Sequence, residues 1–179
     1  MVAADTSASQ FIPVIPQQEH ERRTRRKVSP DSDLWDLLDV VHDPEIPALS
    51  LWDLGVLQNV ERRDGTVVVT MTPTYSGCPA VRVMAEDVET ALMNAGFESV
   101  LVEVRLSPAW TTDWLSAAAR DQLKGYGIAP PGETAQEDVL CPLCSSAETR
   151  LISEFGSTAC KALYKCNSCL EPFDYFKSI

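Results

Sequence analysis

The sequence contains no long hydrophobic run. No apolar stretch approaches the roughly 20 residues of a membrane-spanning helix, and the amino terminus lacks the apolar core of a secretory signal. The 179 residues include only six cysteines, too few and too clustered for a disulfide scaffold in a chain of this size. We therefore expect a soluble, cytoplasmic protein that does not associate with membranes. Its paired cysteines are expected to act as metal ligands or redox thiols.

Positive charge is also scarce. The chain carries 15 basic and 26 acidic residues, which gives a net charge of −11. Five of the basic residues lie in one short run from Arg22 to Lys27, so residues 28–179 hold 10 basic against 23 acidic side chains. A body this acidic repels phosphate backbones, so no nucleic acid partner is expected.

The strongest motif is a pair of Cys-x-x-Cys sequences separated by twenty-one residues. Two intervening residues let both sulfurs of a pair reach one ion from a tight turn, and two such turns supply a tetrahedral site. A closed four-thiolate site favours one structural zinc ion over an iron centre. Residues 140–179 are too few to fold without the metal, so they are predicted to form a zinc ribbon. The predicted ligands are Cys141, Cys144, Cys166 and Cys169.

A domain of about 100 residues is expected before the ribbon. Residues 1–29 are polar and basic, which predicts a disordered tail, either an electrostatic hook or a solubilising arm. The domain itself should cover residues 30–125, beginning with a helix capped by Ser29. An Asp64-Gly65 hairpin, a third strand and further helices should follow. The glycines and prolines of residues 126–139 predict a linker.

A lone cysteine is the second chemical feature. Cys78 ends a loop rich in glycine and serine, and Pro79 and a helical apolar pattern follow it. With Pro79 at the first helical position, Cys78 would be the N-cap, where free N–H groups and the helix dipole favour the thiolate. The alternative is a small buried residue that caps a turn. Asp43 and Glu45 lie on a stiff, proline-rich loop that either contacts a metal or thiol or only turns the chain.

Three blocks of the first domain resemble the iron-sulfur assembly domain of SufT-like proteins and the eukaryotic cytosolic targeting factors. The blocks are Asp43-Pro-Glu-Ile-Pro47, Ser50-Leu-Trp-Asp-Leu-Gly-Val56 and Pro73-Thr-Tyr-Ser-Gly-Cys-Pro79. The segment from Cys141 to Phe173 is similar to the zinc-ribbon extension of the PaaD family, which is the D component of the phenylacetyl-CoA epoxidase system. Together the two resemblances cover about residues 31–179.

This resemblance implies an α+β fold, in which a small three-stranded mixed sheet packed with helices is followed by the zinc ribbon. It implies an accessory role, not an enzyme activity, in maturing the ring-epoxidising monooxygenase of phenylacetate catabolism. Cys78 would be the reactive or cluster-transfer thiol, supported by Asp43, Glu45 and Thr74. The resemblance also makes Cys160 an additional thiol of the ribbon pattern. The implied cofactors are structural zinc and a transient iron-sulfur cluster.

Three functions are compatible with these residues. The first is delivery of an iron-sulfur cluster to an epoxidase component, above all the ferredoxin-type reductase. Because a cluster normally needs four ligands, Cys78 would share it with a second copy of the chain in a homodimer, with a partner, or with oxygen ligands. The second is a zinc-ribbon scaffold that docks epoxidase components without transfer chemistry. The third is a thiol enzyme with His42 as its base, because His20 lies in the expected tail.

Overall fold

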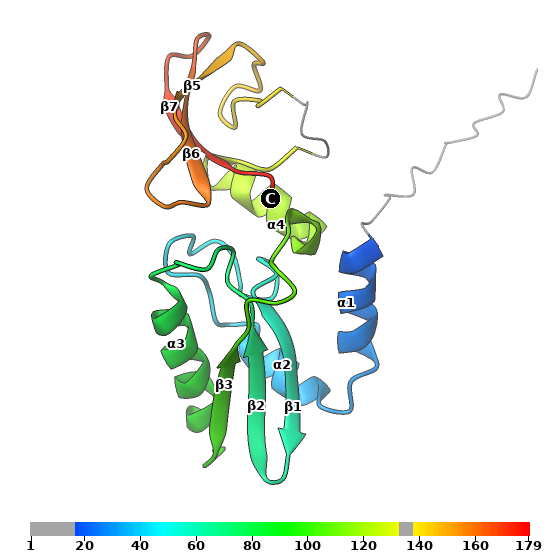
Figure 1. Ribbon diagram of the computed structural model, residues 1–179. Coiled ribbons are helices and arrows are strands. Elements are labelled where there is room, and N and C mark those ends of the chain that lie inside the picture. Colours follow the sequence, from blue (N-terminus) through cyan, green and yellow to red (C-terminus); the bar gives the residue numbers. More distant parts are fainter. Residues whose placement is uncertain (1–16, 133–137) are drawn as a thin grey trace, which may run out of the picture.

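The computed structural model describes residues 17–132 and 138–179. Within these ranges the chain forms two sheets with helices around and between them (Figure 1). None of the described helices has both the length and the apolar character needed to cross a bilayer. The expected α+β fold, with a three-stranded mixed sheet ahead of a ribbon, is confirmed.

The first sheet has the strand order β1-β2-β3. β1 (Leu57–Arg63) and β2 (Thr66–Met71) form the predicted antiparallel hairpin, and its turn residues Asp64 and Gly65 both have positive φ. α3 (Val81–Asn94) then carries the chain back to β3 (Val100–Val104), which pairs in parallel with β2. In a β-α-β unit of this kind the end of β2 and the start of α3 lie at the carboxyl ends of the parallel strands, and Cys78 lies there.

One face of this sheet is buried and the other is polar. α2 (Ser32–Leu38) and α3 pack on the buried face, to which β2 contributes Val69 and Met71. On the other face lie Thr70 of β2 and Thr72 just after this strand, and both line a cleft described below. α2 begins slightly later than predicted, because the Ser29 hydroxyl accepts a hydrogen bond from the N–H of Asp31 and not from a helical residue.

The second sheet has the strand order β4-β7-β6-β5. It follows the 3-10 helix η1 (Thr112–Trp114) and α4 (Ala117–Gly125), which lies between the two sheets in Figure 1. The remaining strands are β4 (Ile128–Ala129), β5 (Thr149–Ser153), β6 (Lys161–Cys166) and β7 (Pro172–Phe176).

The predicted linker over residues 126–139 is wrong at its start. Ile128 and Ala129 are buried and pair in parallel with Asp174 and Tyr175 of β7, so they are part of the ribbon sheet. Burial of these two apolar side chains is favourable, and a solvent-exposed linker would lose that free energy. Prolines are tolerated at the end of a short edge strand, so those that follow Ala129 do not prevent this pairing.

The ribbon and the first domain share one hydrophobic core. Phe176 of β7 is fully buried and packs against Trp110, with the ring centroids 5.9 Å apart. The indole N–H of Trp110 donates to the carbonyl of Leu54 at 3.1 Å. At the end of the chain, the carbonyl of Ile179 accepts hydrogen bonds from the backbone N–H and hydroxyl of Thr112. The ribbon is therefore fixed against the first domain.

The prediction of a disordered tail over residues 1–29 is wrong for residues 17–27, while residues 1–16 lie outside the described ranges. Residues Gln17–Lys27 form helix α1, which has no apolar face. Arginine replaces apolar side chains in the docking of this helix. The buried guanidinium of Arg22 donates to three backbone carbonyls, those of Trp114 at 2.6 Å and of Trp52 and Leu57 at 3.1 Å each. Arg22 and Arg26 also lie over the ring of Trp52, at 4.3 and 5.1 Å from its centroid.

Gly55 fixes the turn before β1. It has a φ of +79°, and a Cβ added there would lie 2.7 Å from the Cβ of Trp114. We expect Gly55→Ala to lower the free energy of unfolding by about 3 kcal/mol, through backbone strain and overpacking. Gly65→Ala is the control, because Gly65 has a φ of +81° but open space around it. Its expected cost is about 1 kcal/mol. Equal losses in urea denaturation would show that the close approach to Trp114 is unimportant.

Candidate functional site

The four predicted metal ligands come together at the tip of the ribbon. The Sγ atoms of Cys141, Cys144, Cys166 and Cys169 all lie within 4.8 Å of one another. Cys141 and Cys169 are 3.7 Å apart, and Cys144 and Cys166 are 3.6 Å apart. Sulfurs bound at about 2.3 Å to a tetrahedral zinc lie about 3.8 Å from one another. The cluster therefore has the dimensions of a four-thiolate metal site.

Each Cys-x-x-Cys pair lies on a tight turn. The residues that follow the second cysteine of each pair, Ser145 and Leu170, have positive φ values of 60° and 68°. In the second turn the backbone N–H groups of Ser168 and Cys169 point at the sulfur of Cys166, at 3.3 and 3.4 Å. These N–H groups, that of Cys169 first, lower the pKa of the Cys166 thiol to about 6. Such hydrogen bonds stabilise the thiolate that a metal requires.

Cys160 is outside this cluster. It is buried immediately before β6, and its Sγ lies 3.1 Å from the hydroxyl of Thr158. Cys160 belongs to the hydrophobic core that the ribbon shares with the first domain. Cys160 therefore lies in the ribbon but faces the first domain, a position that its spacing from Cys166 could not reveal.

A small pocket brings Cys78 and Cys160 together. It encloses about 20 Å³ at the boundary between the first domain and the ribbon, and both thiols line it. Asp43, Glu45 and Thr74, the supporting residues named from the sequence, also line this pocket. Phe176 forms its apolar wall from the ribbon side. The structure thus gathers the residues around Cys78 and adds a second thiol from a different part of the chain.

The loop of Asp43 presents a buried carboxylate to the pocket. Its Oδ1 accepts hydrogen bonds from the N–H groups of Glu45 at 2.7 Å and Ile46 at 2.8 Å, so the proline-rich loop folds around the side chain. Burial raises the pKa of Asp43, although these two hydrogen bonds oppose the shift. Glu45, by contrast, is exposed at the mouth of the pocket.

The expectation that Cys78 is an N-cap with a stabilised thiolate is wrong. α3 begins at Val81 with Ala80 as its N-cap, and Cys78 lies in the turn before it. Burial raises the pKa of the Cys78 thiol. The N–H groups of Ala80 and Val81 act in the opposite direction, as a cap would, but the charges of Asp43 and Cys160 add to the effect of burial. The resting form of Cys78 is therefore the thiol.

The raised pKa of Cys78 predicts slow alkylation. Because the thiolate is the reactive form, a raised pKa leaves less of it at any pH below that value. The rate of iodoacetamide labelling at Cys78 should be below that of free cysteine at pH 8. It should still rise about ten-fold per pH unit through pH 9. Peptide mapping by mass spectrometry separates Cys78 from the other thiols, and a plateau near pH 7 would contradict the shift.

The histidines do not complete a catalytic dyad with Cys78. His42 is exposed, its Nδ1 lies 2.7 Å from the carbonyl oxygen of Pro47, and it is absent from the described residues that line the Cys78 pocket. His20 is on the exposed side of α1. A thiol enzyme that uses either imidazole as a base therefore has no support in this geometry.

Comparisons with known proteins agree with this division of the chain. The family profile described as iron-sulfur cluster assembly protein matches residues 31–104, and the PaaD zinc beta ribbon domain matches residues 130–177. An Fe-S protein maturation auxiliary factor of Porphyromonas gingivalis is 37% identical over 95 residues, which cover 52% of this chain and 90% of that protein. The domain of unknown function DUF59 from Bacillus anthracis, a crystal structure, is 26% identical with a TM-score of 0.48, covering 58% of this chain and 95% of that one.

One relative matches almost the whole chain. The putative D component of the 1,2-phenylacetyl-CoA epoxidase of Escherichia coli strain K12 is 51% identical over 171 residues. The match covers 93% of this chain and 96% of that protein, so it extends over both the first domain and the ribbon. The chain therefore belongs to the PaaD family, the D components of the phenylacetyl-CoA epoxidase system.

Proposed function

We propose that this chain is an accessory maturation protein that accepts iron, or an iron-sulfur cluster, at the Cys78–Cys160 pocket. It then passes this cargo to the ferredoxin-type reductase of the phenylacetyl-CoA epoxidase system. The observation that carries the proposal is that two thiols from different parts of the chain line one pocket beside a buried carboxylate. Thiolates are the usual protein ligands of iron-sulfur clusters.

A bound cation would favour ionisation of the acidic groups that face the pocket. The groups that face it include Asp43, Tyr75 and Cys78, and the pKa of each is raised, with burial as the main cause. Each group therefore holds its proton more tightly than it would in water. A bound metal ion replaces such protons and stabilises the ionised ligands, so metal loading releases protons.

The size of the pocket limits what it can hold. A volume of about 20 Å³ has room for one species the size of a water molecule or a metal ion. A cluster is larger and normally needs four ligands, of which this pocket offers two thiols. Cluster binding therefore requires the pocket to widen and the recipient protein to supply the missing ligands. That opening couples acceptance of the cargo to docking on the recipient.

The four-cysteine cluster has a different role in this proposal. It holds one structural zinc ion, which fits the sulfur spacing and leaves no coordination position open for chemistry. The zinc fixes the turn before β5 and the turn that joins β6 to β7. Cys160, just before β6, and Phe176 of β7 line the pocket. The metal thus positions the second thiol without taking part in transfer.

Reconstitution of the apo reductase tests the proposal. Wild-type protein should accelerate the return of cluster absorbance, whereas Cys78→Ser and Cys160→Ser should each remove most of the acceleration. The zinc content and unfolding midpoint of each variant serve as controls, because neither residue is a predicted zinc ligand. His42→Ala should remain fully active.

Two outcomes would contradict this function. Wild-type activity in both thiol variants, combined with loss of reductase binding when the ribbon is altered, would favour the docking-scaffold alternative. A loss in Cys78→Ser alone, with full activity in Cys160→Ser, would leave the first domain as the only thiol site and remove the shared pocket from the mechanism.

A further inference from the structure

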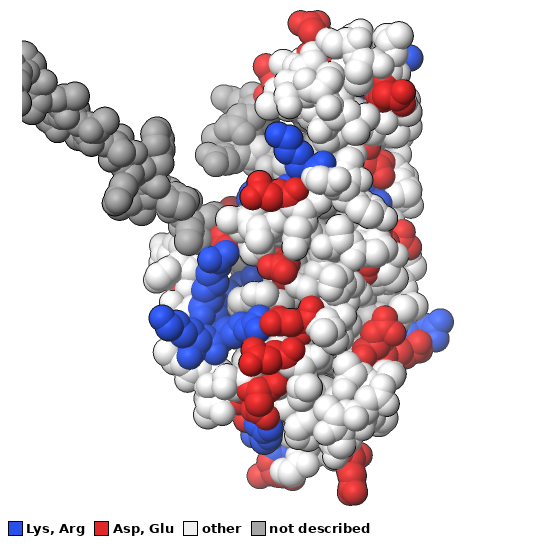
Figure 2. Space-filling view, turned by 180° about the vertical axis from the view of Figure 1, so that it is seen from behind, with Lys and Arg blue, Asp and Glu red and all other residues white. Residues whose placement is uncertain are grey.

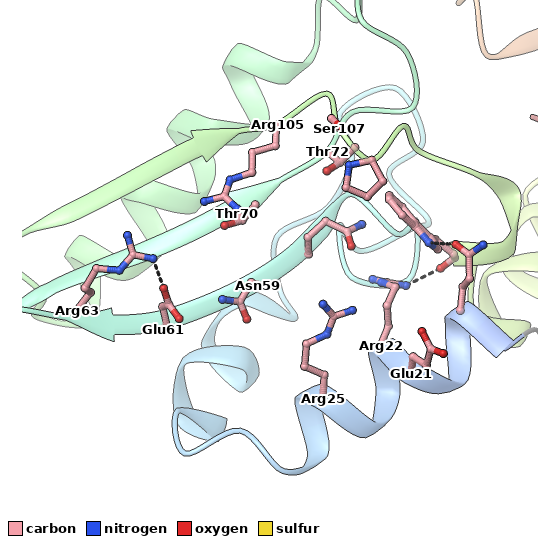
Figure 3. A pocket seen from close by; sticks show the side chains of 14 residues that line it. Glu21, Arg22, Arg25, Asn59, Glu61, Arg63, Thr70, Thr72, Arg105 and Ser107 are labelled. Carbon is pink, nitrogen blue, oxygen red and sulfur yellow. Dashed lines mark hydrogen bonds and ion pairs between the residues drawn. The ribbon is translucent and has the colours of Figure 1, made fainter.

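An arginine-lined cleft lies on the sheet face that the core leaves free (Figure 3). It measures about 590 Å³ and is bounded by α1, β1, β2 and the segment after β3. Most of its other lining side chains are neutral hydrogen-bonding groups, including Thr70 and Thr72. The charged side chains among the described lining residues are Arg22, Arg25, Arg63, Arg105, Glu21 and Glu61.

The cleft is positive in an otherwise acidic protein. The chain has a net charge of −11, yet the described lining holds twice as many arginines as glutamates. Figure 2 shows basic side chains gathered on the α1 side of the molecule, next to a band of acidic ones. A local reversal of charge in a concave site concentrates anions there.

Two of the arginines form no ion pair within the described part of the chain. Arg22 is 3% exposed, and within the described chain it has no ion pair and its Nε has no hydrogen-bond partner. Arg25, on the next turn of α1, is exposed and makes neither an ion pair nor a hydrogen bond with the described residues. Burial and then the charge of Arg25 lower the pKa of Arg22 to about 10, so Arg22 remains protonated at neutral pH. An anion bound beside them would relieve this repulsion.

The opposite wall supplies arginines that can be recruited. Arg63 pairs with Glu61 (Figure 3), and Arg105 pairs with Glu103 at 2.5 Å. Both arginines are more than half exposed, and ion pairs in such positions contribute little free energy. A more highly charged anion can therefore compete with these glutamates.

The geometry points to a small phosphate-bearing ligand, one with a pyrophosphate group and the size of a nucleotide, as the occupant of this cleft. The planar guanidinium group binds phosphate through two parallel hydrogen bonds, and the volume lies in the range of small-molecule sites. A protein partner fits less well, because the described residues of the lining offer no exposed aromatic anchor: their tryptophan, Trp114, is 6% exposed. The cleft is separate from the Cys78–Cys160 pocket and does not depend on the function proposed there.

Calorimetric titration of the full chain at low salt tests this inference with inorganic pyrophosphate, ADP and coenzyme A as probes. We expect binding that weakens about ten-fold in Arg25→Gln, because one charged hydrogen-bond donor is lost. Arg82→Gln is the control, because it removes the same charge from an exposed position of α3 that is outside the described lining of the cleft. This variant should bind with unchanged affinity. Equal affinity for all three probes would identify the free pyrophosphate group as the ligand. Tighter binding of ADP and coenzyme A would identify a nucleotide.

Three results would overturn the inference. They are the absence of binding by all three probes, an equal loss of affinity in Arg25→Gln and Arg82→Gln, and tighter binding of a hexaglutamate peptide than of any phosphate compound. The last result would assign the cleft to an acidic segment of a partner protein.

Discussion

Replacement of Cys166 by serine should release the ribbon metal and unfold the second sheet. The free energy of metal binding, of order 10 kcal/mol for four-thiolate zinc sites, contributes directly to the folding of such small domains. Because Phe176 packs against Trp110, the loss should also reach the first domain. Hydrogen exchange should show loss of protection throughout β5, β6 and β7, with the central strand β2 the last to exchange.

Cys160→Ser is the matched control for this prediction. It makes the same chemical change in the same sheet, but Cys160 is outside the four-cysteine cluster. This variant should keep one zinc per chain and near wild-type protection in β6. If Cys166→Ser also kept one metal per chain, or if its ribbon amides stayed protected, the four sulfurs would not form the site that holds the ribbon together.

Arg22→Met should lower the free energy of unfolding by about 4 kcal/mol. The change leaves three carbonyl oxygens, those of Trp52, Leu57 and Trp114, without their charged donor, and each such hydrogen bond contributes about 1.5 kcal/mol. It also removes the guanidinium that lies over the ring of Trp52. We therefore expect α1 to detach. Urea denaturation measures the global loss, and faster trypsin cleavage within residues 17–27 reports the detachment.

Arg25→Met separates this anchoring from general effects of charge or helix propensity. Arg25 lies on the same helix and is exposed, and it makes no hydrogen bond with the described residues. Its replacement should change the free energy of unfolding by less than about 0.5 kcal/mol. Similar losses in the two variants would contradict the role assigned to the three carbonyl contacts of Arg22.

The parts of the fold with local signals could be predicted from the sequence. The Asp64-Gly65 turn and the alternating valines identified the hairpin and the third strand, because these patterns follow from short-range geometry. α1 could not be predicted from hydrophobic periodicity, since arginines and not apolar residues fix it to the protein. The spacing of Glu19 and Arg23, which form an ion pair at 2.6 Å, was one of the local helix signals in that segment.

The metal ligands could also be predicted, because both Cys-x-x-Cys turns are local. The pocket of Cys78 needed the structure. Cys160 is 82 positions further along the chain, and it reaches Cys78 through the packing of Phe176 against the first domain. The direction of the Cys78 pKa shift was missed for the same reason. Position before a helix indicates a stabilised thiolate, but the burial and neighbouring acidic groups that oppose it come from tertiary contacts.

Cobalt(II) titration of the zinc-replete protein tests most directly whether Cys78 and Cys160 form one metal site. With the ribbon ligands occupied, we expect one further Co²⁺ ion to bind and produce thiolate-to-cobalt charge-transfer absorption. The intensity should be about halved in Cys78→Ser and in Cys160→Ser, since each variant removes one of two thiolate ligands, and it should vanish in the double variant. Absorption that was absent from the wild type, or unchanged by Cys160→Ser, would show that the two thiols do not share a metal.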